Sequence, residues 1–202
     1  MVKRILIGVG VAVGLLVAAV AVLGMIAPTE LHVEREVLIN QPKNVVFEEL
    51  KQMKNHDVWS PWFKRDPNLV KKYRGTDGTV GFVSSWSGNE EVGVGEQEIT
   101  KIAEGERLDY ELRFEEPFED TNTAYLITEE NGKAQTKVRW GLDGKLLFPG
   151  NIMCMLMNMK AKLAADFDEG LAGLKEHMET QPAAAVEPEM EKESESVGPD
   201  EE

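Results

Sequence analysis

Residues 107–114 read RLDYELRF, with an apolar side chain at every second position and a charged one at each position between. This period of two is typical of a β-strand that buries one face and exposes the other to water. The apolar face consists of Leu108, Tyr110, Leu112 and Phe114. The stretch therefore predicts a half-buried strand in an antiparallel sheet, because parallel sheets are covered on both faces.

Similar short runs lie on both sides of this strand, and each ends at turn residues. The dipeptides Asp77-Gly78, Asn131-Gly132 and Asp143-Gly144 favour tight turns between antiparallel strands. The runs that we expect to form strands cover residues 31–40, 69–73, 79–87, 92–102, 106–114, 121–128 and 133–142. We predict a meander of antiparallel strands, with a short helical segment after the first strand.

The hydrophobic period changes at Asn151. From Ile152 to Met178, apolar residues recur at steps of three and four, which is the period of an amphipathic helix. We expect one long helix over residues 151–178. A sheet with one wet face must cover the other, and this helix is the element long enough to do so. The predicted class is α+β: a curved antiparallel sheet wrapped around a long C-terminal helix, with a cavity between them.

The amino end of the chain is apolar without interruption from Ile5 to Ala27, and Lys3 and Arg4 precede it. A helix of that length measures about 35 Å, enough to cross the hydrocarbon core of a bilayer. We predict a retained transmembrane helix; the alternative is a cleaved signal peptide, for which residues 24–28 are a poor cleavage site. The positive-inside bias makes the amino terminus cytoplasmic and the domain extracytoplasmic, or periplasmic in a bacterium.

The sequence divides into three regions: an anchor at residues 1–28, one folded domain at 29–180 and an acidic tail at 181–202. The tail carries eight acidic residues against one lysine, and we expect it to be disordered because it has few large apolar side chains. With a net charge of -14, the chain has no electrostatic attraction for nucleic acid.

Signatures of metal and nucleophile chemistry are missing from the sequence. Cys154 is the only cysteine, which excludes an intramolecular disulfide, and the three histidines have no metal-ligand spacing. No serine nucleophile elbow, zinc signature or phosphate-binding loop occurs. We therefore expect neither a metal site nor a cofactor.

Strand alternation and the start of the long helix supply the candidates for a ligand pocket. The candidate ligand-binding residues are Trp59, Trp62, Trp86, Gln97, Tyr110, Phe114, Tyr125, Trp140, Met153, Leu156 and Met157. The same residues are also what a packed core needs. Gly93 and Gly95, at alternate positions, favour a cavity because they leave space beside the strand, although a β-bulge explains them equally well. The methionines suit a cavity that adapts to varied apolar guests, or plain helix packing.

The order of elements and the residues within them resemble the START-like, or SRPBCC, superfamily with its helix-grip (Bet v 1-like) fold. The resemblance is greatest to membrane-anchored bacterial proteins described as polyketide cyclase/dehydrase-like. It covers about residues 30–179 and rests on VEREVLINQP at 33–42, WSPW at 59–62, GTDGTVG at 75–81, VGVGEQ at 92–97 and DFDEGL at 166–171. Members of this superfamily bind lipids, sterols, hormones and polyketides, and only some are enzymes.

The resemblance and the sequence together favour a membrane-anchored module that binds a lipid-like or aromatic small molecule between sheet and helix. One alternative is a cyclase-like enzyme acting in the same cavity, with Tyr110, Gln97 or Trp86 shaping a reactive ligand. Another is a protein-interaction module that uses the acidic tail. The spacing of Gly10 and Gly14 also allows two anchors to pair weakly, or reflects the usual small-residue content of such helices.

Overall fold

A computed structural model describes residues 2–180, so the expectation of a disordered acidic tail lies outside the described residues. The chain begins with helix α1 (Val2–Ile26) and passes through three linking residues into strand β1 (Glu30–Ile39). Three short helices follow: α2 (Lys43–Lys51), α3 (His56–Trp59) and α4 (Pro61–Arg65). Next come the strands β2 (Val70–Arg74), β3 (Val83–Ser87), β4 (Val94–Ala103), β5 (Arg107–Glu116), β6 (Asp120–Glu130) and β7 (Thr136–Lys145). The described chain closes with α5 (Gly150–Leu156) and α6 (Met159–Thr180).

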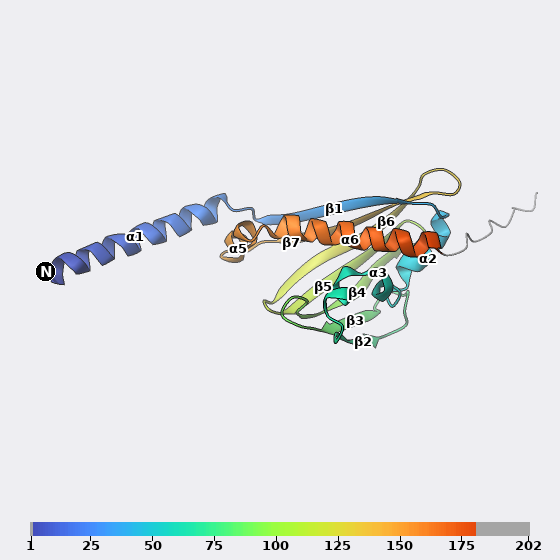
Figure 1. The fold of residues 1–202 in the computed structure, drawn as a ribbon, viewed down its shortest axis with the longest axis horizontal. Coiled ribbons are helices and arrows are strands. Elements are labelled where there is room, and N and C mark those ends of the chain that lie inside the picture. Colours follow the sequence, from blue (N-terminus) through green and yellow to red (C-terminus); the bar gives the residue numbers. More distant parts are fainter. Residues whose placement is uncertain (1, 181–202) are drawn as a thin grey trace, which may run out of the picture.

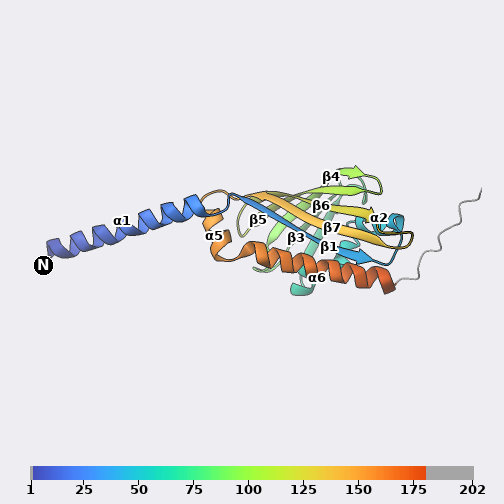
Figure 2. The ribbon, with the colours of Figure 1, turned by 90° about the horizontal axis from the view of Figure 1, so that it is seen from above.

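All seven strands form one antiparallel sheet in the order β1-β7-β6-β5-β4-β3-β2. The sheet curves, and α6 runs along its inner face (Figure 1; Figure 2). β1 is an edge strand. Its one neighbour is β7, the last strand in the sequence, with which it pairs from Glu30↔Lys145 to Ile39↔Thr136. The predicted α+β class, an antiparallel sheet around a C-terminal helix, is confirmed.

Register assigns the side chains to the two faces of the sheet, because residues directly opposite in an antiparallel pair point the same way. Tyr110 lies opposite Ile99 on β4 and Ala124 on β6. All three are buried on the inner face. The charged residues of the quoted stretch lie on the outer face, as their alternation predicts.

The core lies between the inner face of the sheet and the helices α2 and α6. The apolar residues of α6 recur at steps of three and four and face the sheet: Ala164, Phe167, Leu171, Leu174 and Met178. In α2, Val46, Phe47 and Leu50 are buried, and Pro42 precedes the first turn, where a missing N–H leaves no helical bond unmade.

The prediction of one helix from Asn151 to Met178 is wrong, because the helix breaks at Asn158. This residue has φ 52°, a left-handed conformation that asparagine tolerates better than most residues. Leu156, expected on the buried face, is 70% exposed. The break lets α5 turn away from the sheet and lie beside the end of α1 (Figure 2).

Two turn predictions also need correction. β7 does not end before Asp143-Gly144 but continues to Lys145, because β1 is long enough to pair with it there. Asp77-Gly78 lies within a longer connection between β2 and β3. Asn131-Gly132 does lie in the turn between β6 and β7, where Gly132 has φ 86°.

Helix α1 extends away from the domain and buries none of its residues (Figure 1). It is long and apolar enough to cross a membrane, a property shared by transmembrane spans and signal sequences. Only Ala27, Pro28 and Thr29 separate it from β1, and the N–H of Leu146 donates to the Thr29 carbonyl at 2.8 Å.

Candidate functional site

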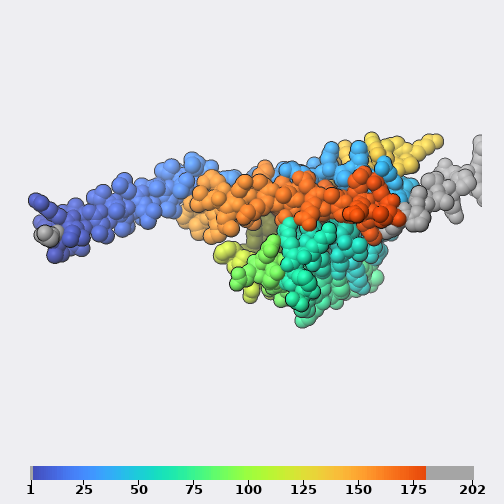
Figure 3. Space-filling model, in the orientation of Figure 1, coloured from blue at the N-terminus to red at the C-terminus, as the bar shows by residue number. Residues whose placement is uncertain are grey.

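The inner face of the sheet has a packed half and an open half. In the half far from α1, Ile99, Leu108 and Val138 are fully buried beneath α2 and the end of α6. In the half near α1, the side chains are only half-buried: Trp86, Gln97, Leu112 and Phe114. Figure 3 shows the surface hollowed between α6 and the light-green residues below it, at the end of the domain where α5 lies. We call this region the hollow.

An aromatic cluster fills the centre of the grip, between the two halves. Trp140 of β7 stacks on Phe167 of α6, with ring centroids 4.4 Å apart. Trp59 and Trp62 each contact the Trp140 indole edge to face, with ring centroids 5.6 and 5.7 Å apart. Trp59 is buried, whereas Trp62 and Trp140 are half-buried and border the hollow. Part of the expected cavity is therefore packed core.

Gly93, just before β4, and Gly95, within it, do not leave empty space. A β-carbon on Gly95 would lie 2.8 Å from the indole of Trp86, which occupies that position. Gly93 precedes the strand with φ 71°, and its β-carbon would lie 2.4 Å from the Glu116 carbonyl oxygen. The pairing of β4 with β5 shifts register between Val94 and Gly95. The bulge explanation is the one that the structure supports.

Trp86 and Phe114 lie together at the open end, with centroids 5.7 Å apart and planes at 76°. The indole N–H of Trp86 donates to the Val92 carbonyl at 3.4 Å. Gln97 lies between Ser84 and Leu112 across the strands, so its amide is on the face that carries these rings. Three predicted site residues therefore meet at the hollow, with one amide beside two aromatic rings.

Tyr110 lies in the packed half instead, beside His56. The Tyr110 hydroxyl and the His56 Nε2–H both donate to the Leu50 carbonyl, at 3.4 and 2.7 Å. That carbonyl lies in the last turn of α2, where helix carbonyls lack helical partners. Burial lowers the pKa of His56 to about 4 and raises that of Tyr110 above its ordinary value. Both groups are neutral and structural.

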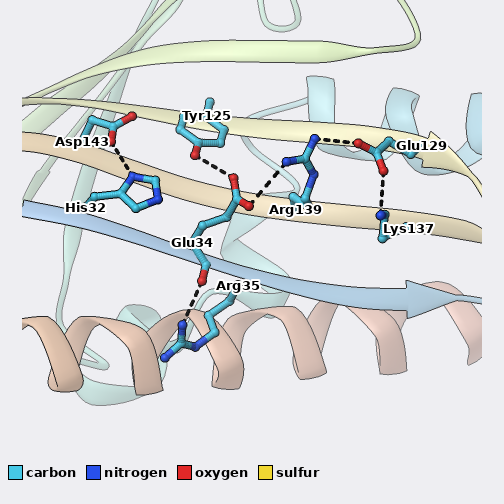
Figure 4. Close-up of polar contacts among 8 residues, drawn as sticks. All are labelled: His32, Glu34, Arg35, Tyr125, Glu129, Lys137, Arg139 and Asp143. Carbon is cyan, nitrogen blue, oxygen red and sulfur yellow. Dashed lines mark hydrogen bonds and ion pairs between the residues drawn. The ribbon is translucent and has the colours of Figure 1, made fainter.

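Tyr125 lies on the outer face, because the neighbouring Ala124 and Leu126 take the inner positions of β6. Its expected place in the pocket is therefore corrected. The ring covers Gly141, and the hydroxyl donates to Glu34 Oε2 at 2.7 Å (Figure 4). Burial and this hydrogen bond raise the pKa of Tyr125 to about 12.

The outer face around Tyr125 carries a chain of ion pairs. Arg139 reaches Glu34 at 3.4 Å and Glu129 at 2.6 Å, and Lys137 reaches Glu129 at 2.8 Å (Figure 4). These charges are partly exposed and mutually paired. Glu34 and Glu129 each line one open surface groove, and none of the predicted ligand-binding residues lines either groove.

A second charged cluster joins α3 to β2, and no pattern in the sequence predicts it. Asp57 accepts hydrogen bonds from Lys71 and, at 2.7 Å, from the Tyr73 hydroxyl. The Lys71 ammonium also lies 3.9 Å from the centre of the Phe63 ring. Burial lowers the pKa of Lys71. These residues are brought together by the fold, and their spacing in the sequence does not predict the contacts.

Met153, Leu156 and Met157 belong to α5 and its end, and all three are exposed rather than enclosed by the grip. Among the described residues, no group of three or more His, Cys, Asp or Glu side chains is placed to hold a metal ion. Two open surface grooves, of about 430 and 450 Å³, are lined by none of the predicted site residues.

Solved structures share the architecture. A protein from Thermobifida fusca is 19% identical with a TM-score of 0.56, and the match covers 73% of this chain and 92% of that one. The domain has the helix-grip fold. XoxI from Bacillus cereus is 13% identical with a TM-score of 0.55, covering 74% and 96% of the two chains. DynU16, from the dynemicin biosynthetic locus, is 16% identical with a TM-score of 0.51, covering 74% and 47%. No protein-family model and no curated protein matches the sequence.

At these identities the similarity shows the helix-grip fold alone. Any inference about a ligand therefore depends on the residues of this domain.

Proposed function

We propose that this protein is a membrane-anchored helix-grip module that binds a hydrophobic small molecule in the hollow. The observation that carries the proposal is that Trp86, Leu112 and Phe114 stay half-exposed on the inner face of the sheet, whose other half is packed. Large apolar side chains left open beneath a helix are a typical lining for an apolar ligand. Trp62 and Trp140 border the same space.

The lining indicates the chemistry of the ligand. Aromatic rings at the open end suit a flat or chain-like apolar ligand, and the Gln97 amide offers an NH2 group as donor and a carbonyl oxygen as acceptor to a polar group on it. Arg113 pairs with both Glu96 and Glu98 on the outer face of the same strands, so these three charges are not offered to a ligand in the hollow. A lipid-like or aromatic neutral ligand fits best.

Helix α1 anchors the module in this proposal, with its amino terminus in the cytoplasm and the domain outside, in the periplasm if the cell is bacterial. The basic residues Lys3 and Arg4 lie at the start of α1 and support this orientation. The enzyme alternative keeps only Gln97 and Trp86 as candidate residues, because Tyr110 is buried against α2.

The test is native mass spectrometry of the full-length chain in detergent, combined with lipid extraction. Two Leu→Trp variants form a matched pair: Leu112→Trp fills the hollow, and Leu38→Trp adds the same bulk to an exposed position on β1. We expect an apolar molecule to co-purify with the parent chain and with Leu38→Trp, and to be lost from Leu112→Trp. A parent chain that stays empty after exposure to lipid extracts would contradict the proposal.

A further inference from the structure

The segment between Lys145 and Lys160 is the longest uncharged stretch of the folded domain, in a chain of which 29% of residues are charged. It contains α5, and much of it is exposed to solvent. The exposed large apolar side chains are Leu147, Phe148, Met153, Leu156, Met157 and Met159. Contiguous apolar surface of this kind on a soluble domain usually marks a binding surface.

This segment lies directly beside the end of α1. The Asn151 side-chain amide donates to the Gly24 carbonyl at 3.3 Å, and a β-carbon on Gly24 would lie 3.1 Å from the Phe148 ring. Asn151 itself is buried. Both ribbon views place α5 at the junction of α1 with the domain (Figure 1; Figure 2).

The position of α5 along α1 determines its depth in a membrane. α1 ends at Ile26, so Gly24 lies in its last turn, about 3 Å from the end at the usual helical rise. If α1 spans a bilayer, a segment that contacts Gly24 is level with the border between hydrocarbon and headgroups. That border accepts an amphipathic short helix lying in its plane.

We infer that residues 146–159 form a second membrane contact, seated in the interface of the bilayer that holds α1. The inference rests on the anchoring part of the proposed function. Leu147, Phe148 and Leu156 enter the apolar side of the interface, while Lys145 and Lys160 extend their ammonium groups to the headgroups. The bond from Asn151 satisfies a carbonyl at the end of α1 that water reaches poorly at that depth.

A bilayer fits this surface better than a protein partner does. Its apolar residues lie next to the exposed apolar surface of α1, because Asn151 and Phe148 contact Gly24 of that helix. Along the sequence, the segment is bounded on both sides by lysines, Lys145 and Lys160.

The test measures how deeply α5 is immersed, using the full-length chain in phosphatidylcholine vesicles. Cys154 is first replaced, as Cys154→Ser, so that an introduced cysteine carries the only nitroxide label. Labels are placed with Leu156→Cys or Phe148→Cys, and the control label with Val80→Cys. Val80 is equally exposed but lies in the connection from β2 to β3, at the far end of the sheet from α1.

Electron paramagnetic resonance then compares collisions of each label with oxygen, which concentrates in the bilayer, and with a water-soluble nickel chelate. We expect the oxygen-to-nickel ratio at positions 148 and 156 to be several-fold that at position 80. Water-like values at 148 and 156 in protein that floats with the vesicles would overturn the inference and leave the anchor standing. Protein that fails to float would overturn both. Ligand co-purification is scored separately, so its failure is distinguishable from either result.

Discussion

The indole ring of Trp140 lies parallel to the phenyl ring of Phe167, with their centroids 4.4 Å apart and their planes 6° apart. This contact joins the middle of β7 to the middle of α6. Gly170 makes room for it, because a β-carbon there would lie 2.7 Å from the Trp140 ring. The stack therefore sets the spacing of helix and sheet at the border between the packed half of the grip and the hollow.

Replacing Phe167 by alanine should lower the free energy of unfolding by about 3–5 kcal/mol, because it removes a fully buried ring and leaves a cavity. Phe118→Ala is the matched control, since Phe118 is exposed in the β5–β6 turn. Urea unfolding followed by tryptophan fluorescence measures both variants. Equal losses in the two would show that the stack does not hold the helix to the sheet.

His56 should make the domain less stable in mild acid. The unfolded chain takes up a proton near the ordinary pKa of 6.5, while the folded protein binds it only near about 4. The contribution is therefore complete above pH 6.5 and is lost as the pH falls toward 4, by up to about 3 kcal/mol. Unfolding measured at pH 7 and pH 5 should show a smaller difference in His56→Gln than in the parent chain. An unchanged pH difference would contradict this account.

Asp57 should contribute more to stability than an exposed carboxylate does. Asp57→Ala leaves the partly buried Lys71 ammonium and the Tyr73 hydroxyl without their acceptor, an expected loss of about 1–3 kcal/mol. The control is Asp168→Ala, which breaks the exposed pair with Arg35 and should change stability by less than about 1 kcal/mol. Adding Lys71→Met to Asp57→Ala should restore part of the loss. No recovery in the double variant would mean that the ammonium is not the source of the loss.

The proposed orientation predicts which side of the membrane a thiol reagent reaches. In a Cys154→Ser background, Val80→Cys should react with a membrane-impermeant maleimide in intact cells whose outer barrier has been opened. Val2→Cys, at the start of α1, leaves both basic residues in place and should react only after the membrane is dissolved. The opposite pattern would place the domain in the cytoplasm, and labelling of soluble protein alone would indicate a cleaved α1.

The sheet was largely predictable because alternation is a local property. The apolar positions of residues 107–114 lie on the inner face, and the period of three and four places Phe167, Leu171 and Leu174 against the sheet. In these elements, the positions that are apolar in the sequence are the positions that face the core.

The rest depended on contacts between distant parts of the chain. The spacing of apolar residues in α6 continues through α5, so the sequence pattern does not show that the helix breaks. The break is seen only in the left-handed backbone of Asn158 and in the contact of α5 with α1. Tyr125 is large and apolar enough for either face, and its side was decided by Ala124 and Leu126 and by the space over Gly141. Gly95 shows in the sequence that a side chain is missing at that position. That the Trp86 ring fills the space follows only from the packing of the folded chain.

The three residues between α1 and β1 also limit how far the domain can move from α1. Fully extended, these three residues span at most about 10 Å. The hydrogen bond from the Leu146 N–H to the Thr29 carbonyl restricts their movement further. If α1 is held in a bilayer, as proposed, the domain stays at a constant height above the membrane and moves only within its plane. For the proposed function this means that a ligand has to reach the domain by diffusion, and that passing it on requires an acceptor at the same membrane.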